Sequence, residues 1–249
     1  MKRSVALLGS TLLLTLLATP AFAQAISIDL GANGGAGATS RLVQLTALVT
    51  GLSLAPSLLV MMTAFTRIII ALSILRSALS LQGVPPNIVL IGLALFLTFH
   101  VMEPVLDQAW TGALLPMTEG RIGEMEGLQR AAAPFRGFML ANARPDDLQL
   151  FADLAQAGRA DITKPEDVPW RALVPGFLVS ELRRGFEIGF MIYLPFLIID
   201  LVVASILMSL GMMMLPPNAV SLPFKLIFFV MVDGWRLIAG SLVQSFAAG

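Results

Sequence analysis

The stretch from Pro195 to Pro223, PFLIIDLVVASILMSLGMMMLPPNAVSLP, limits what this chain can fold into more than any other part of the sequence. It opens with an apolar run long enough for a helix that crosses a bilayer, and this run carries one ionisable residue, Asp200. An unpaired charge in hydrocarbon costs at least a few kcal/mol, so such residues mark functional sites. Asp200 is therefore a candidate functional residue, and it requires a partner.

Three consecutive methionines, Met212, Met213 and Met214, follow this run and precede the pair Pro216 and Pro217. The prolines predict the end of the helix, because proline lacks an N–H donor and disfavours the α conformation in the residue before it. Methionine side chains are unbranched and polarizable. On a turn between two apolar helices they can line a soft, adaptable surface.

The composition indicates an integral membrane protein or a membrane-derived assembly: 57% of the residues are hydrophobic, 13% are charged, and the mean hydropathy is +0.84. The formal net charge is zero and no block is rich in Lys and Arg, so nucleic acid is not an expected partner. The absence of cysteine excludes disulfides and thiolate chemistry. Because His100 is the only histidine, a histidine metal cluster is excluded as well, and we expect no cofactor.

Residues 1–23 have the three parts of a cleavable signal peptide, ending in the A-x-A site Ala21-Phe22-Ala23. Cleavage after Ala23 would place the mature N-terminus outside the cytoplasm, and an uncleaved anchor is the alternative. Residues 24–40 contain GANGGAG, which lacks the Gly-Lys-Ser/Thr ending of a phosphate-binding loop. We interpret them as a flexible tail.

Residues 41–106 form a first apolar hairpin region, in which two topologies are possible. Either residues 42–65 span the bilayer and Arg67 and Arg76 lie just beyond on the cytoplasmic side, or Pro56 begins a helix that contains Arg67. The first alternative fits the positive-inside rule.

An internal similarity supports the second alternative. The tripeptide Pro85-Pro86-Asn87 recurs as Pro216-Pro217-Asn218, and aligning the two places Ile69 on Asp200. The regions 41–106 and 185–249 are then two related helical hairpins, as found in transport proteins. Chance sharing of a turn tripeptide is the other explanation.

Residues 107–184 carry most of the acidic residues and many basic ones, which predicts a charged helical segment in water. Long translocated segments are exempt from the positive-inside count, so a periplasmic location is allowed. Arg144-Pro145-Asp146-Asp147 resembles a helix start, with acids at the positive end of the dipole. We expect short helices that are too small for an independent core and pack against copies of themselves.

Further charged residues lie close to the apolar helices. Glu181, Arg184 and Glu187 are spaced three apart, which predicts a charged stripe that pairs with a neighbouring subunit. We expect one last apolar helix from Pro223 to Phe246, in which Lys225 lies near one end, where it can snorkel. The same helix would allow an ion pair between Asp233 and Arg236.

The sequence from about Leu52 onward resembles the FliP family of the flagellar type III export apparatus, whose relatives are the SctR proteins of virulence secretion. The motifs that carry the resemblance are MMTAFTRIIIALSILRSAL (61–79), PPNIVLIGLALFLTF (85–99), SELRRGFEIGF (180–190), PFLIIDLVVASILMSLGMMMLPP (195–217) and SLPFKLIFFVMVDGW (221–235). The predicted signal peptide and the sizeable charged segment resemble those of the flagellar branch of this family.

The resemblance implies an all-α, membrane-type protein with two long apolar hairpins and a small periplasmic helical segment between them. Copies of the chain would assemble with FliQ-like and FliR-like membrane subunits into a helical channel for unfolded flagellar proteins. This export gate would lie in the inner membrane, in contact with lipid, at the flagellar basal body. The assembled hairpins would be lifted partly out of the bilayer, so that protein contacts shelter Arg67, Arg76, Asp200 and Lys225.

The resemblance also implies a role for the methionine loop. Met212, Met213 and Met214 match a ring that acts as a gasket around the closed pore. Gly211, Pro216 and Pro217 would then be hinge residues that let the loop move.

A second hypothesis is a carrier for ions or small solutes that uses Asp200 as its coupling carboxylate. An enzyme is not expected, because the sequence contains neither Gly-x-Ser-x-Gly nor His-Glu-x-x-His.

Overall fold

The computed structural model describes residues 60–81, 83–155, 167–212 and 214–247, together with isolated positions between 43 and 57. The predicted signal peptide and tail, and Met213, lie outside the described residues. The chain divides into two compact units, Met1–Ser53 and Leu54–Gly249, and the architecture below is that of the second unit.

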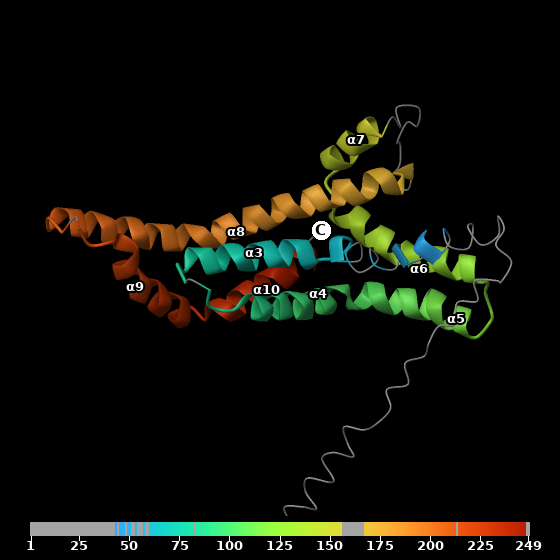
Figure 1. The fold of residues 1–249 in the computed structure, drawn as a ribbon, viewed down its shortest axis with the longest axis horizontal. Coiled ribbons are helices and arrows are strands. Elements are labelled where there is room, and N and C mark those ends of the chain that lie inside the picture. Colours follow the sequence, from blue (N-terminus) through green and yellow to red (C-terminus); the bar gives the residue numbers. More distant parts are fainter. Residues whose placement is uncertain are drawn as a thin grey trace, which may run out of the picture. The chain divides into compact units, whose positions relative to one another are not determined.

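The second unit is all-helical throughout its described part, with no strand (Figure 1). The helices in chain order are α3 (Phe65–Ala78), α4 (Asn87–Ala109), the π-helix η1 (Trp110–Leu114), α5 (Leu115–Thr118), α6 (Glu124–Asn142), α7 (Pro145–Leu154), α8 (Trp170–Ser209), α9 (Pro217–Met231) and α10 (Gly234–Ala247).

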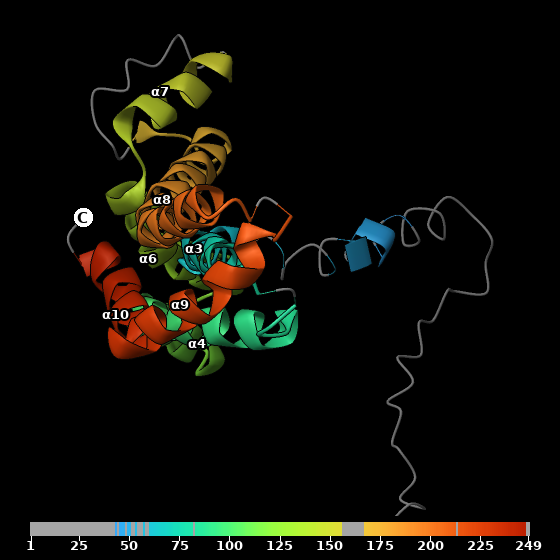
Figure 2. The same cartoon turned by 90° about the vertical axis from the view of Figure 1, so that its left-hand side faces the viewer.

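Helix α3 is the centre of the main core. Its apolar residues point in several directions, and Ile68, Ala71, Leu72 and Leu75 are all at most 1% exposed. A helix that is apolar on all sides must be buried. Residues of α4, α8, α9 and α10 complete the cluster, and the end-on view in Figure 2 shows α3 between α8 and α4.

Two glycines bring α8 against α3. A Cβ added at Gly185 would lie 3.2 Å from Cβ of Ile70, and one added at Gly189 would overlap the side chain of Ile74. Because the contacts advance together along both helices, α3 and α8 run in the same direction. Small residues four apart allow this close backbone approach.

Within the described residues, two helical stretches are long and apolar enough to cross a membrane, Asn87–Thr118 and Trp170–Ser209. Helix α8 has 40 residues, so at about 1.5 Å per residue it is about 60 Å long, about twice the thickness of the hydrocarbon core. Only 17% of its most apolar window is buried. The rest of this surface is available to lipid or to partner proteins.

The predicted last helix, from Pro223 to Phe246, is wrong: α9 begins at Pro217, and a 64° bend separates it from α10. Asp233 lies at the break with φ of 51°, a left-handed conformation that Asp tolerates better than most residues. Gly234 then allows the turn, because a Cβ there would overlap the ring of Phe229.

The charged segment forms a second, smaller cluster with the beginning of α8. Its buried residues come from α6, α7 and α8 and include Met139, Ala152, Leu173 and Phe177. These helices therefore pack on α8 of their own chain. The predicted helix start at Arg144-Pro145-Asp146-Asp147 is confirmed, because α7 begins at Pro145 with both aspartates in its first turn.

Candidate functional site

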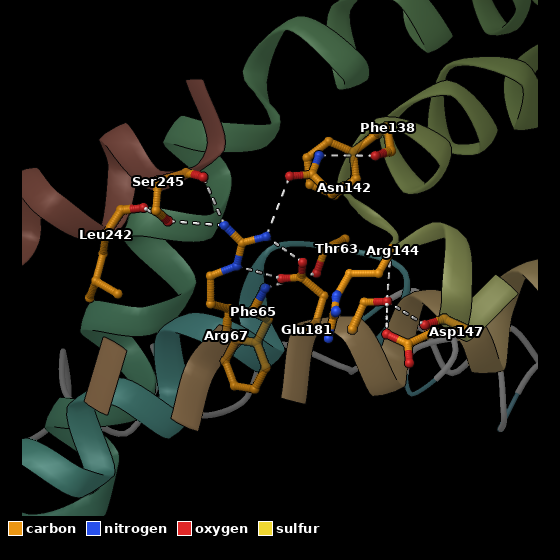
Figure 3. Close-up of polar contacts among 12 residues, drawn as sticks. Thr63, Phe65, Arg67, Phe138, Asn142, Arg144, Asp147, Glu181, Leu242 and Ser245 are labelled. Carbon is orange, nitrogen blue, oxygen red and sulfur yellow. Dashed lines mark hydrogen bonds and ion pairs between the residues drawn. The ribbon is translucent and has the colours of Figure 1, made fainter. Parts of the chain in front are cut away.

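The buried guanidinium of Arg67 lies where α3, α6, α8 and α10 meet (Figure 3). Its Nε donates to Oε2 of Glu181 at 2.9 Å, and its Nη2 donates to Oε1 of the same carboxylate. Nη2 also donates to Oδ1 of Asn142 at 3.4 Å. Both Arg67 and Glu181 are 0% exposed. The pair is bidentate, the strongest geometry that arginine makes with a carboxylate.

The end of α10 completes this site. Nη1 of Arg67 donates to the carbonyl of Ser245 at 2.9 Å and to its hydroxyl at 3.0 Å. The guanidinium also lies over the ring of Phe246, 3.6 Å from the centroid. All five N–H groups of Arg67 thus have acceptors, which is what a buried charge requires.

Ser180 connects α7 to the same place on α8. Its hydroxyl accepts from the backbone N–H of Arg144 at 2.9 Å and donates to Oδ2 of Asp147 at 2.7 Å. Because Ser180 precedes Glu181, the charged segment is fixed to α8 beside the buried ion pair.

A second polar cluster holds Asp200. Nζ of Lys225 donates to Oδ2 of Asp200 at 2.6 Å, and the hydroxyl of Ser221 donates to Oδ1 at 2.5 Å. Nζ also donates to the carbonyl of Ala78 at 2.9 Å and to the hydroxyl of Ser80 at 2.8 Å. Lys225 is 1% exposed, so it is buried and does not snorkel. The cluster joins α8 and α9 to the end of α3.

The other predicted polar residues lie apart from these clusters. Arg76 donates to Oδ1 of Asn87 at 2.5 Å and to the carbonyl of Pro85 at 3.5 Å. Glu187 pairs with Arg183 on the exposed face of α8 at 2.9 Å, whereas no ion pair of Arg184 is found among the described residues. Glu181, Arg184 and Glu187 therefore do not act as one stripe, and Glu181 takes its partner from its own chain.

Helix α8 ends in a hydrogen-bonded turn at Gly211 and Met212. The N–H of Gly211, with φ of 71°, donates to the carbonyl of Met208, and the N–H of Met212 donates to that of Leu207. These two bonds form a Schellman motif, which ends α8. The prolines therefore do not end α8 as predicted. Pro216 is the N-cap of α9 and Pro217 its first residue.

The loop exposes its apolar side chains. Met212 is 44% exposed and Met214 is 99% exposed, and Leu210 and Leu215 are also exposed. Within the described residues, no group of three or more His, Cys, Asp or Glu side chains could hold a metal ion. Among the described residues, the site thus contains the buried ion pair of Arg67 with Glu181, the ion pair of buried Lys225 with partly buried Asp200, and the exposed side chains of Met212 and Met214.

The model of the FliP family matches residues 48–242. The chain belongs to the FliP family. It is similar to the flagellar biosynthetic protein FliP of Rhizobium meliloti, with 52% identity over 83% of this chain and 84% of the relative. The FliP proteins of Caulobacter vibrioides (51% identity over 90% of this chain and 83% of the relative) and Bacillus subtilis (51%, over 83% and 93%) are similar as well.

Several partners of the predicted polar residues were not predicted from the sequence. Ser221 lies four residues before Lys225, so its helical spacing could have placed it beside the same cluster. Asn142, Ser180 and Ser245 carry no such signal, because each meets its partners only through the tertiary fold.

Proposed function

We propose that this chain is a core channel subunit of the flagellar type III export gate. Several copies assemble with FliQ-like and FliR-like subunits in the inner membrane at the basal body, and unfolded flagellar proteins pass through the channel. The N-terminus and residues 107–184 lie on the periplasmic side. Membership of the FliP family supports the export apparatus, and the largely exposed apolar surface of α8 supports assembly with other membrane proteins.

The observation that carries the channel role is the methionine loop. Met214 is almost completely exposed, between the Schellman motif that ends α8 and the two prolines that begin α9. A methionine in this position contributes nothing to the core of its own chain. Copies arranged around an axis would bring these side chains together.

A ring of Met212, Met213 and Met214 from several copies would serve as a gasket. Its apolar side chains disfavour a continuous column of water, and their flexibility lets them deform around a passing chain without a specific fit. Gly211, Pro216 and Pro217 would be the hinges at which the loop moves against its helices.

The structure favours this role over a carrier that uses Asp200. Both carboxylate oxygens of Asp200 accept hydrogen bonds, and Lys225 neutralises its charge. A coupling carboxylate has to exchange its ion or proton with solvent, whereas this one lies in a cluster that joins three helices.

The test is the triple variant Met212→Ala, Met213→Ala and Met214→Ala in the assembled complex. We expect ion leakage through the idle complex to rise, with the native mass unchanged. Met191→Ala is the matched control, because Met191 is 73% exposed on α8 outside the loop. Unchanged leakage in the triple variant with intact assembly would refute the gasket.

A further inference from the structure

A pocket of about 690 Å³ lies between the end of α3 and the start of α9. We call it the tip pocket. Its lining includes Arg76, Ser77 and Ser80 from the first hairpin region and Pro216, Asn218 and Leu222 from the second. It therefore combines one cation, several hydrogen-bonding groups and apolar walls, which suits a carboxylate on a protein side chain.

Among the described residues of the hairpin regions, two other basic residues, Arg67 and Lys225, are buried, and Arg76 differs from both. Arg67 pairs with Glu181, and Lys225 pairs with Asp200. Arg76 instead donates only to the neutral oxygens of Asn87 and Pro85 among the described residues.

Arg76 borders the polar groups of the tip pocket and also an exposed apolar surface. Val84 and Ile88, which flank its contacts at Pro85 and Asn87, are 58% and 74% exposed. A half-buried guanidinium beside such a surface calls for an anionic partner, because charges in apolar settings are paired.

The hairpin regions offer one carboxylate for this role. They contain four acidic residues, of which Glu103 lies 4.0 Å from His100, Glu187 pairs with Arg183, and Asp200 pairs with Lys225. Asp233 is the fourth, and no ion pair of it is found within the described part of the chain. It is exposed at the corner between α9 and α10, beside the exposed side chains of Met231 and Trp235.

The positions of Arg76 and Asp233 can be compared along the long helix α8, and they are similar. Ile74, two residues before Arg76, contacts α8 at Gly189. Phe229, which Gly234 abuts, contacts α8 at Phe196, with ring centroids 6.3 Å apart. Gly189 and Phe196 are seven residues apart on α8, so the contacts of Ile74 and Phe229 lie about 10 Å from each other along this helix.

Arg76 and Asp233 lie towards opposite sides of α3. Figure 2 shows α10, which begins directly after Asp233, on one side of α3, and the connection from α3 to α4, which Arg76 contacts, on the other. Within one chain they do not meet. Two copies of the chain can be related by a rotation about an axis that is parallel to the helices. The α9–α10 corner of one copy, which carries Asp233, can then face the tip pocket of the next copy.

We propose that the tip pocket binds Asp233 of a second copy of this chain, and that Arg76 forms an ion pair with this carboxylate across the subunit interface. The inference rests on the proposed function, because it requires several copies in one assembly. The contact is heterologous: every copy offers one pocket and one corner, so the same contact repeats into a ring or a helix.

Charge reversal tests the pairing directly. Arg76→Asp and Asp233→Arg, each alone, should reduce the fraction of chain recovered in multi-copy complexes at least fivefold, and the double variant should restore most of it. The milder variants Arg76→Gln and Asp233→Asn should each give a smaller loss in the same direction, which separates lost pairing from misfolding. If the double variant assembles no better than the worse single variant, the pairing is wrong.

Cross-linking provides a second measurement, because the chain contains no cysteine. In the double variant Arg76→Cys and Asp233→Cys, a short bifunctional thiol reagent should produce a ladder of covalent oligomers. Each single variant, and a control pair of Gly137→Cys with Asp233→Cys, should give none. Gly137 lies on α6 with open space around it.

The outcomes separate the two proposals. A complex with several copies but no ladder from the double cysteine variant would overturn the pairing and leave the export-gate proposal intact. A native mass of one copy for the unaltered chain would overturn both.

Discussion

Arg67 and Glu181, 114 residues apart in the sequence, form a fully buried bidentate ion pair. The pair joins the central helix α3 to the long helix α8, next to the place where Ser180 holds α7. It therefore connects the apolar hairpins to the charged segment.

Glu181→Leu should destabilise the folded chain by about 3 to 5 kcal/mol, because it leaves a buried guanidinium without its counter-ion. The double variant Arg67→Met and Glu181→Leu should recover most of the loss, since an apolar pair can replace a buried ion pair. Thermal unfolding in detergent measures both. Glu187→Gln is the control, because its ion pair with Arg183 is exposed and should be worth less than about 1 kcal/mol.

Local patterns in the sequence predicted the features that local physics decides. The start of α7 follows from a proline at the first helical position and two aspartates in the first turn. The all-helical class follows from long apolar runs that only helices or closed barrels can satisfy in a membrane. The need of Asp200 for a partner follows from the cost of an unpaired charge.

The break at Asp233 was missed, although Asp233-Gly234 is a dipeptide that marks turns. The apolar residues on both sides made the segment look continuous. The partners of Arg67 could not have been predicted at all, because Glu181, Asn142 and Ser245 lie on three other helices and meet only when the core forms. Helix packing, which no spacing in one segment encodes, decides these contacts.

Gly189→Val should weaken the packing of α3 on α8 by about 1 to 3 kcal/mol, the typical cost of overpacking a core. The added side chain would overlap Ile74, so Ile74→Ala in the same chain should restore part of the loss. Chemical or thermal unfolding in detergent would show the effect. Gly92→Ala is the matched control: it has open space around it on α4 and should gain up to about 1 kcal/mol from helix propensity. Equal effects at both glycines would contradict the close approach.

Removal of residues 245–249 should destabilise the chain by about 2 to 5 kcal/mol, because two N–H groups of a buried charge lose their acceptors. The cation–π contact with Phe246 is lost as well. Ser245→Ala should cost less, because the backbone carbonyl still accepts from Arg67. Protease resistance and unfolding temperature would report both changes, and a chain that lacks only residues 248–249 is the control. If the chain without residues 245–249 is as stable as this control, the contacts of α10 with Arg67 do not stabilise the fold.

Asp200→Asn should lower stability by about 2 to 3 kcal/mol and reduce assembly, because Lys225 keeps its charge in a buried site and loses the carboxylate. Loss of export in the single variant does not show whether Asp200 supports the structure or couples transport to an ion or proton. The double variant Asp200→Asn and Lys225→Met does, because it removes the stranded charge and the carboxylate together. If Asp200 is structural, the double variant regains assembly and export of flagellar proteins, measured by native mass and by secretion into the medium. If Asp200 couples transport to an ion or proton, the double variant assembles but moves nothing, since no carboxylate remains to bind the coupling ion.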